Sequence, residues 1–186
     1  MKNPLPPHAK KVFQGHRFSI WQWEQQLFDG STALFEKIGR PDSTDVIAVT
    51  PEKKILVDYE DQPNNHGFIT LPGGGVDGDE TPLENAQREL AEETGYTSDT
   101  WEHFWQVSPH ASVECVTHYF IAKNCIKTTD VHLDPGERIR TAAVSFDEFV
   151  EIVCSSTFRD QLFATFILRC RLDPQKMAEF KRRLGL

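Results

Sequence analysis

The segment from Gly73 to Tyr96 constrains this chain most, because it joins three consecutive glycines to the boundary signals of a short helix. Thr81 is a suitable N-cap, Pro82 takes the first helical position, and the glutamate three residues after Thr81 completes a capping box. Gly95 can adopt the left-handed conformation that ends a helix. The sequence therefore predicts a glycine loop followed by a helix of fewer than about four turns.

Three glutamates share one face of this predicted helix. Glu89, Glu92 and Glu93 are spaced by three and four residues, which places their carboxylates side by side. Like charges one turn apart cost only a few tenths of a kcal/mol per pair, so a solvated acidic face is also compatible with the spacing. An apolar stripe on the other sides of the helix can face a core: Leu83, Ala86, Leu90 and Ala91.

Loop and helix together fit the longer pattern G-x5-E-x7-R-E-U-x-E-E-x-G-U, in which U is a bulky apolar residue. Its specified positions are filled by Gly74, Glu80, Arg88, Glu89, Leu90, Glu92, Glu93 and Gly95. Tyr96 stands where an aliphatic residue is usual. The pattern resembles the signature box of the Nudix hydrolases. The resemblance implies an α/β fold, the Nudix-type α/β/α sandwich with a mixed sheet, and hydrolysis of a nucleoside diphosphate linked to another group.

The resemblance also implies a Mg²⁺ site, with Mn²⁺ as a substitute. Its ligands would be the carboxylates of Glu89, Glu92 and Glu93 and the carbonyl of Gly73. Such hard cations take oxygen ligands, neutralise charge on a diphosphate and lower the pKa of bound water from 15.7 toward 7. A metal would also reconcile an anionic substrate with an acidic protein.

Further box residues receive roles in catalysis and substrate binding. Arg88 is expected to act in catalysis with Glu92 by orienting carboxylates through bidentate pairing. Gly74 and Glu80 are expected at the substrate, and the resemblance gives Glu80 a structural pairing with the arginine or a contact to the metal from its outer shell.

The attacking water needs a base from outside the box. In relatives that act on ADP-ribose this base is a glutamate of a mobile loop late in the chain. Glu137, in the segment 133–139, is the first candidate, and a surface carboxylate beside a turn is the competing interpretation. The alternative bases are Glu114, Asp134 and Glu60.

The overall layout is similar to the ADP-ribose and nucleoside-diphosphate-sugar branch of the family. Pro109 falls near the position of a proline that marks ADP-ribose use there. Tyr59-Glu60 departs from that branch, in which the strand before the box commonly carries Tyr-Arg. Arg40, or a partner's side chain, would then supply the positive contact to the diphosphate. The alternatives are a hydrolase of dinucleoside polyphosphates, NADH or nucleoside triphosphates, and a Nudix module that binds a nucleotide without cleaving it.

Composition limits the partners and the compartment. A net charge of -8 argues against binding nucleic acid or an anionic membrane through the protein's own field. The first seven residues lack the apolar run of a signal peptide, and no segment approaches the roughly 20 apolar residues of a membrane span. The four cysteines have no C-x-x-C spacing, which is typical of reduced thiols in a cytoplasmic enzyme.

The chain is expected to divide into an N-terminal β arm, residues 1–42, and a Nudix hydrolase domain, residues 43–186. The first ten residues are proline-rich and predicted to be poorly ordered, whereas residues 12–38 alternate in strand fashion around a turn at 29–31. The arm's large aromatics suit either packing against the domain or an interface, and a homodimer is expected. Residues 61–67 are predicted as a polar loop and 113–122 as one strand. Helices are predicted at 146–153, 158–171 and 174–184.

Overall fold

A computed structural model describes residues 4–186. Expectations for residues 1–3, including their part in a leader or a disordered tail, lie outside the described residues. The helices are α1 (Pro82–Thr94), α2 (Phe146–Val153), α3 (Gln161–Arg171) and α4 (Pro174–Arg183). The strands are β1 (Lys10–Gln14), β2 (Ser19–Gln26), β3 (Thr32–Gly39), β4 (Ser43–Val49), β5 (Ile55–Gln62), β6 (Asn65–Thr70), β7 (Tyr96–Thr97), β8 (Thr100–Val107), β9 (Val113–Glu114), β10 (Thr117–Lys123), β11 (Ile126–Lys127) and β12 (Arg138–Val144).

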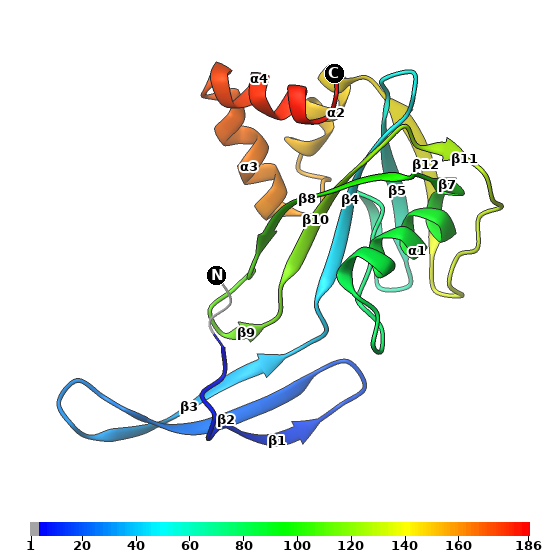
Figure 1. Ribbon diagram of the computed structural model, residues 1–186. Helices are drawn as coiled ribbons and strands as arrows, with labels where there is room; N and C mark the ends of the chain where they lie inside the picture. Colours follow the sequence, from blue (N-terminus) through cyan, green and yellow to red (C-terminus); the bar gives the residue numbers. More distant parts are fainter. Residues whose placement is uncertain (1–3) are drawn as a thin grey trace.

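The centre of the molecule is a mixed sheet between two helical layers, which confirms the predicted α/β/α architecture. The strand order is β12-β5-β4-β10-β8, with β6 also paired to β5. Strands β4 and β10 run parallel, whereas the other pairs are antiparallel. Helix α1 covers one face, and α2, α3 and α4 gather on the other (Figure 1).

The central strand β4 explains why both faces need a helical cover. Val46 and Ala48 point toward α1 and belong to the smaller core, which includes Leu90 of that helix. Ile47 and Val49 alternate to the opposite face and enter the larger core formed with the C-terminal helices. Because β4 is buried on both sides, its residues pack against α1 on one face of the sheet and against the C-terminal helices on the other.

Helix α1 has the boundaries that the sequence predicts. Thr81 accepts a hydrogen bond from the backbone of Glu84, whose side chain accepts one from the backbone of Thr81 in return. Gly95 ends the helix with φ 75°. The predicted apolar stripe is wrong at Leu83, which is 38% exposed, because the buried position of the first turns is taken by Asn85.

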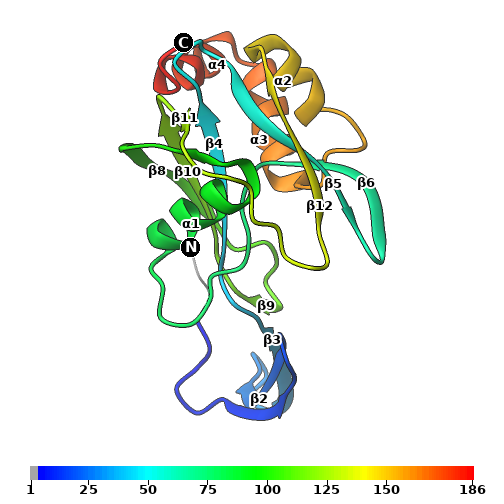
Figure 2. The ribbon, with the colours of Figure 1, turned by 90° about the vertical axis from the view of Figure 1, so that its right-hand side faces the viewer.

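The arm is a separate sheet at one end of the sandwich (Figures 1 and 2). The predicted hairpin is confirmed as β2 and β3, and the structure adds β1 as a third strand. The strand predicted at 113–122 is interrupted, because its first residues, β9, leave the central sheet and pair in parallel with β3. The backbone N–H of Val116 donates instead to a carboxylate oxygen of Asp42 at 2.8 Å.

The prediction of a loop at 61–67 is also wrong. Strand β5 continues to Gln62, and β6 begins at Asn65 after a two-residue connection. The tip of this hairpin is exposed and carries an unbroken run of polar residues and turn residues, so it lacks the apolar alternation that indicates a strand. Gly67 has φ 68° and donates its N–H to the side chain of Asp61 at 2.8 Å.

The structure also bears on the expectations about membrane spans and cysteines. None of the helices within residues 4–186 is long and apolar enough to cross a membrane. Cys115, Cys125, Cys154 and Cys170 are all free thiols.

Candidate active site

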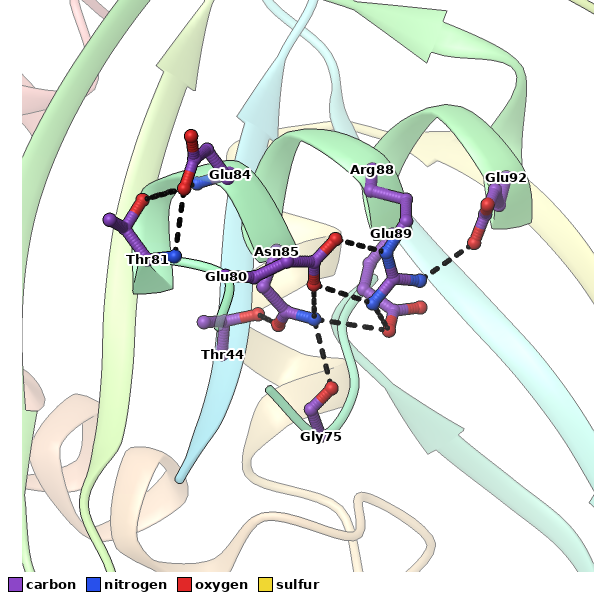
Figure 3. A network of polar contacts seen from close by, with 9 residues as sticks. All are labelled: Thr44, Gly75, Glu80, Thr81, Glu84, Asn85, Arg88, Glu89 and Glu92. Carbon is purple, nitrogen blue, oxygen red and sulfur yellow. Dashed lines mark hydrogen bonds and ion pairs between the residues drawn. The ribbon is translucent and has the colours of Figure 1, made fainter. Parts of the chain in front are cut away.

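Arg88 is the centre of a carboxylate network on the outer side of α1 (Figure 3). Its Nε and Nη2 donate to the two oxygens of Glu80 at 3.0 and 3.2 Å. Its Nη1 donates to Glu92 at 2.8 Å, and Nη2 lies 3.0 Å from Oε1 of Glu89. Glu84 caps the helix instead of pairing with this arginine. One guanidinium therefore holds three carboxylates, and the pKa of Arg88 is raised chiefly by its hydrogen bond to Glu80.

Asn85 ties the glycine loop to the helix and the sheet. Its Nδ2 donates to the carbonyl of Gly75 at 2.9 Å, and its Oδ1 accepts from the hydroxyl of Thr44 at 2.6 Å. The side chain is fully buried, so these bonds meet its polar atoms without water. Sequence reasoning missed this residue. The available signal was a polar side chain directly beside Ala86 in the apolar stripe.

The glycines of the loop are required by close contacts. A Cβ built on Gly74 would lie 2.5 Å from Oε1 of Glu89, and one on Gly73 would lie 2.1 Å from the carbonyl oxygen of Thr44. Gly73 has φ 152°, and its N–H donates to Oε2 of Glu93 at 2.7 Å. The loop therefore runs directly against the carboxylates of α1. A cation bound by both the loop backbone and these carboxylates would require such a close approach.

Two buried carboxylates face each other behind this loop. Glu93 is 6% exposed, and its pKa is raised well above its usual value by burial and then by the charge of Asp58. Asp58 is fully buried, and burial raises its pKa to about 7 although the side chain of Thr141 is near enough to oppose this shift. No group meets the geometry of a hydrogen bond to either of its carboxylate oxygens within the described residues. Burial also raises the pKa of Glu89 to about 6, despite Arg88. The ion pairs of Arg88 are with Glu80, Glu89 and Glu92, so this arginine does not compensate the charges of Glu93 and Asp58 by direct pairing.

The donor set fits a hard divalent cation, because oxygen ligands predominate and the innermost carboxylates are short of positive partners. Within residues 4–186, no three side chains of His, Cys, Asp or Glu are already arranged to hold a metal ion. The reason lies in the network, since Arg88 holds Glu89 and Glu92 while Gly73 holds Glu93. Cation binding requires these side chains to turn toward a common point.

The structure brings the loop of Glu137 to the box. Burial, followed by the charges of Glu60 and Asp134, raises the pKa of Glu137. The charge of Glu137 in turn contributes to the raised pKa values of Glu89 and Glu93. A carboxyl group with a raised pKa in this position is suited to accept a proton from water.

The other candidate bases are placed differently. Glu60 is 5% exposed and accepts a hydrogen bond from Gln62 at 2.7 Å. The backbone carbonyl of Asp134 accepts the backbone N–H of Glu137 at 2.9 Å and so closes the turn. Glu114 lies on β9, where its carboxylate is 3.4 Å from Nζ of Lys37 in the arm.

A cavity of about 670 Å³ opens beside Glu137. Its size is within the range of small-molecule sites. Arg140 stacks over the ring of Tyr59 at 4.2 Å. The lining residues are Tyr59, Glu60, Asp61, Gly67, Phe68, Ile69, Leu133, Glu137, Arg138, Ile139, Arg140 and Thr157.

None of the four residues expected at the substrate lines this cavity. Gly74 and Glu80 lie at the box, beside Glu89 and Arg88, whereas Arg40 and Pro109 lie elsewhere. Arg40 is exposed, and its Nε donates to the carbonyl of Pro41 at 3.4 Å. Pro109 lies between β8 and β9, in a connection that reaches the arm through Ser112, whose carbonyl accepts from Ile38 at 3.0 Å. Both residues therefore belong to the side of the molecule near the arm.

The glycine loop, the capped acidic helix and the α/β/α sandwich together define the class of this protein. Residues 39–166 match the family model for the NUDIX domain. The chain belongs to the Nudix family. It is a hydrolase that acts on the diphosphate bond of nucleoside diphosphate derivatives, and hydrolases of this family use divalent cations.

Two proteins are similar to this chain in sequence, and one solved structure is similar to it in fold. The chain is 28% identical over 150 residues to the methanol dehydrogenase activator of Bacillus methanolicus, covering 78% of this chain and 80% of that protein. It is 28% identical over 174 residues to the ADP-ribose pyrophosphatase of Bacillus subtilis (strain 168), covering 91% and 94%. The crystal structure of an ADP compounds hydrolase has the same fold, with a TM-score of 0.71, 16% identity, and coverage of 91% and 94%.

Proposed function

We propose that this chain is a Mg²⁺-dependent diphosphatase whose substrate is ADP-ribose or another nucleoside diphosphate sugar. The observation that carries the proposal is the set of acidic side chains on α1, packed against the glycine loop, with Glu93 and Asp58 buried and short of positive charge. The similarity to an ADP-ribose pyrophosphatase supports the substrate class.

In this proposal Glu89, Glu92, Glu93 and the carbonyl of Gly73 hold the cation. The bound ion would neutralise the diphosphate and acidify water. Arg88 keeps the carboxylates of the outer helix face in position before the ion arrives, because it already pairs with Glu89 and Glu92. Its planar fork suits this task better than a lysine.

Glu137 accepts the proton of the attacking water. Its raised pKa makes it a stronger base than an ordinary surface glutamate, and its loop can approach the phosphorus from outside the box. The nearby cavity, with its tyrosine and arginine, would accommodate the group attached to the diphosphate. Four residues complete the proposed substrate contacts: Arg40, Gly74, Glu80 and Pro109.

We further propose that residues 1–42 form a dimerisation arm attached to a Nudix domain of residues 43–186, and that the enzyme is cytoplasmic. Exposed Leu34 and Phe28 on the arm support a partner surface. The free thiols support a reducing compartment.

A substrate panel tests the function. ADP-ribose, GDP-mannose, UDP-glucose, diadenosine polyphosphates, NADH and nucleoside triphosphates are each incubated with enzyme and Mg²⁺, and the products are separated by ion-exchange chromatography. We expect ADP-ribose or a nucleoside diphosphate sugar to be cleaved fastest, with no reaction in EDTA. Cleavage of none, with a nucleotide still bound, would favour a binding module.

A further inference from the structure

The turn between β1 and β2 brings a second arginine to the glycine loop. The N–H of Gly15 donates to the carbonyl of Phe18 at 2.7 Å, which leaves His16 and Arg17 at the tip of the turn. A Cβ built on Gly75 would lie 3.6 Å from Nη2 of Arg17. The tip of the arm thus lies beside the box of its own chain, and the end of the arm lies below the loop that leads into α1 (Figure 1).

The guanidinium of Arg17 is uncommitted. Its side chain is exposed, and within residues 4–186 it makes no hydrogen bond or ion pair. Arg88, by contrast, is bound to Glu80, Glu89 and Glu92, so contact with an anion would require it to release them.

An anionic diphosphate beside the glycine loop would need a positively charged side chain nearby. The protein has a net charge of -8, and on β5 Tyr59 is followed by the buried carboxylate of Glu60. The carboxylates that would hold a divalent ion offset its charge, so the ion and its ligands together would leave negative charge on a bound diphosphate uncompensated. An arginine adds two parallel hydrogen bonds to the same phosphate oxygens.

We infer that Arg17 binds the diphosphate of the substrate in the active site of its own chain. Gly74 lies close to the carboxylate of Glu89, and the next residue, Gly75, lies close to the guanidinium of Arg17, so both groups border the same short stretch of the glycine loop. A long, exposed side chain can reach over this loop toward an anion held there. The arm then has a role in substrate binding within one subunit, and this role rests on the proposed function.

Steady-state kinetics of Arg17→Ala and Arg17→Lys, with His16→Ala as a matched control in the same turn, test the inference. ADP-ribose, GDP-mannose and UDP-glucose are compared, because Arg17 would contact the diphosphate that they share. For each substrate cleaved by the wild type, we expect Arg17→Ala to raise KM about tenfold or more and to change kcat less than about threefold. Arg17→Lys should recover part of the loss, and His16→Ala should match the wild type.

The inference is overturned if Arg17→Ala keeps KM within about twofold of the wild type, or if His16→Ala raises KM equally. The first result, in an active enzyme, leaves the proposed function standing. A wild type that cleaves no panel member removes the proposed function itself. Mixing Arg17→Ala with Glu93→Gln subunits tests the assignment to one chain, since a component with wild-type KM would appear only if Arg17 served the partner's site.

Discussion

Glu93 combines the deepest burial among the box glutamates with a direct bond to the glycine loop. Glu93→Gln keeps the size of the side chain but removes the charge that would hold a cation. We expect kcat to fall by about a hundredfold or more, whereas the melting temperature of the metal-free protein stays the same or rises because Asp58 loses a like-charged neighbour. Turnover and calorimetry are the measurements, and Glu179→Gln on α4 is the control. Full activity of Glu93→Gln would refute its role as a ligand.

Asp58 gives a prediction about stability and pH. Its pKa is raised from the usual 3.8 to about 7 in the folded chain, so between these values the folded state retains a proton that the unfolded state has lost. Stability of the metal-free protein therefore falls as pH rises through this interval. Asp58→Asn should raise the melting temperature in EDTA by a few degrees at pH 8 and change it little at pH 4. An equal shift at both pH values would contradict this cause.

Protons also compete with the cation. The pKa of Glu89 is raised to about 6 by burial, and a protonated carboxyl cannot ligate a metal. The affinity for Mn²⁺, followed by the loss of the free-ion signal in electron paramagnetic resonance, should therefore rise as pH increases from about 5 to 7. An affinity that is constant over this range would contradict a role for Glu89.

The sequence predicted the residues of the box but not the residues behind it. The pairing of Arg88 with Glu92 follows from spacing along one helix, which the sequence contains, whereas its pairing with Glu80 depends on the loop that precedes the helix. Asn85, Asp58 and Arg17 contribute through contacts with other elements, namely β4, α1 and the glycine loop. Such contacts depend on how the chain folds back on itself, so spacing can mark Asn85 as a polar residue beside the apolar stripe but cannot identify its partners.

At the scale of elements, α1 depends on local interactions that can be tested separately. Thr81→Ala removes the hydroxyl that accepts the backbone N–H of Glu84, which is the side-chain half of the capping box, whereas the backbone N–H of residue 81 can still donate to Glu84. We expect a loss of about 1 kcal/mol in stability, which lowers the melting temperature by about 2–4 °C. Thr165→Ala on the exposed face of α3 is the control and should change the melting temperature little. A Thr81→Ala melting curve equal to the wild type would show that tertiary packing alone fixes this end of α1.

The contrast between local and long-range interactions also explains which helices and strands could be predicted from the sequence. Caps and apolar runs are local, so α1, α2 and the hairpin of β2 and β3 agree with the sequence. The β5–β6 hairpin was missed because its end is polar, and the break before β10 was missed because β9 joins the arm. Those features depend on pairing with distant strands.

At the scale of the whole molecule, the arm leaves apolar side chains uncovered. Leu34 is 66% exposed, and Phe28 projects fully from the turn. Trp23 is instead packed within the arm against Phe35, with ring centroids 6.0 Å apart, so its replacement would unfold the arm itself. A dimer surface must therefore use the exposed residues.

We expect Leu34→Asp combined with Phe28→Ser to shift the molar mass from a dimer to a monomer in light scattering, because both changes oppose burial of this face. Leu172→Ser is the matched control, since Leu172 is 87% exposed at the end of α3, away from the arm. A wild type that is already monomeric, or a double variant that stays dimeric, would contradict the arm as the interface.

Diffraction from crystals soaked in Mn²⁺, recorded at the manganese absorption edge, tests the cation site most directly. We predict an anomalous peak about 2–2.5 Å from carboxylate oxygens of Glu89, Glu92 and Glu93, with Glu89 and Glu92 turned away from Arg88. Ion pairs to Arg88 that persist unchanged, with no peak beside α1, would contradict the account.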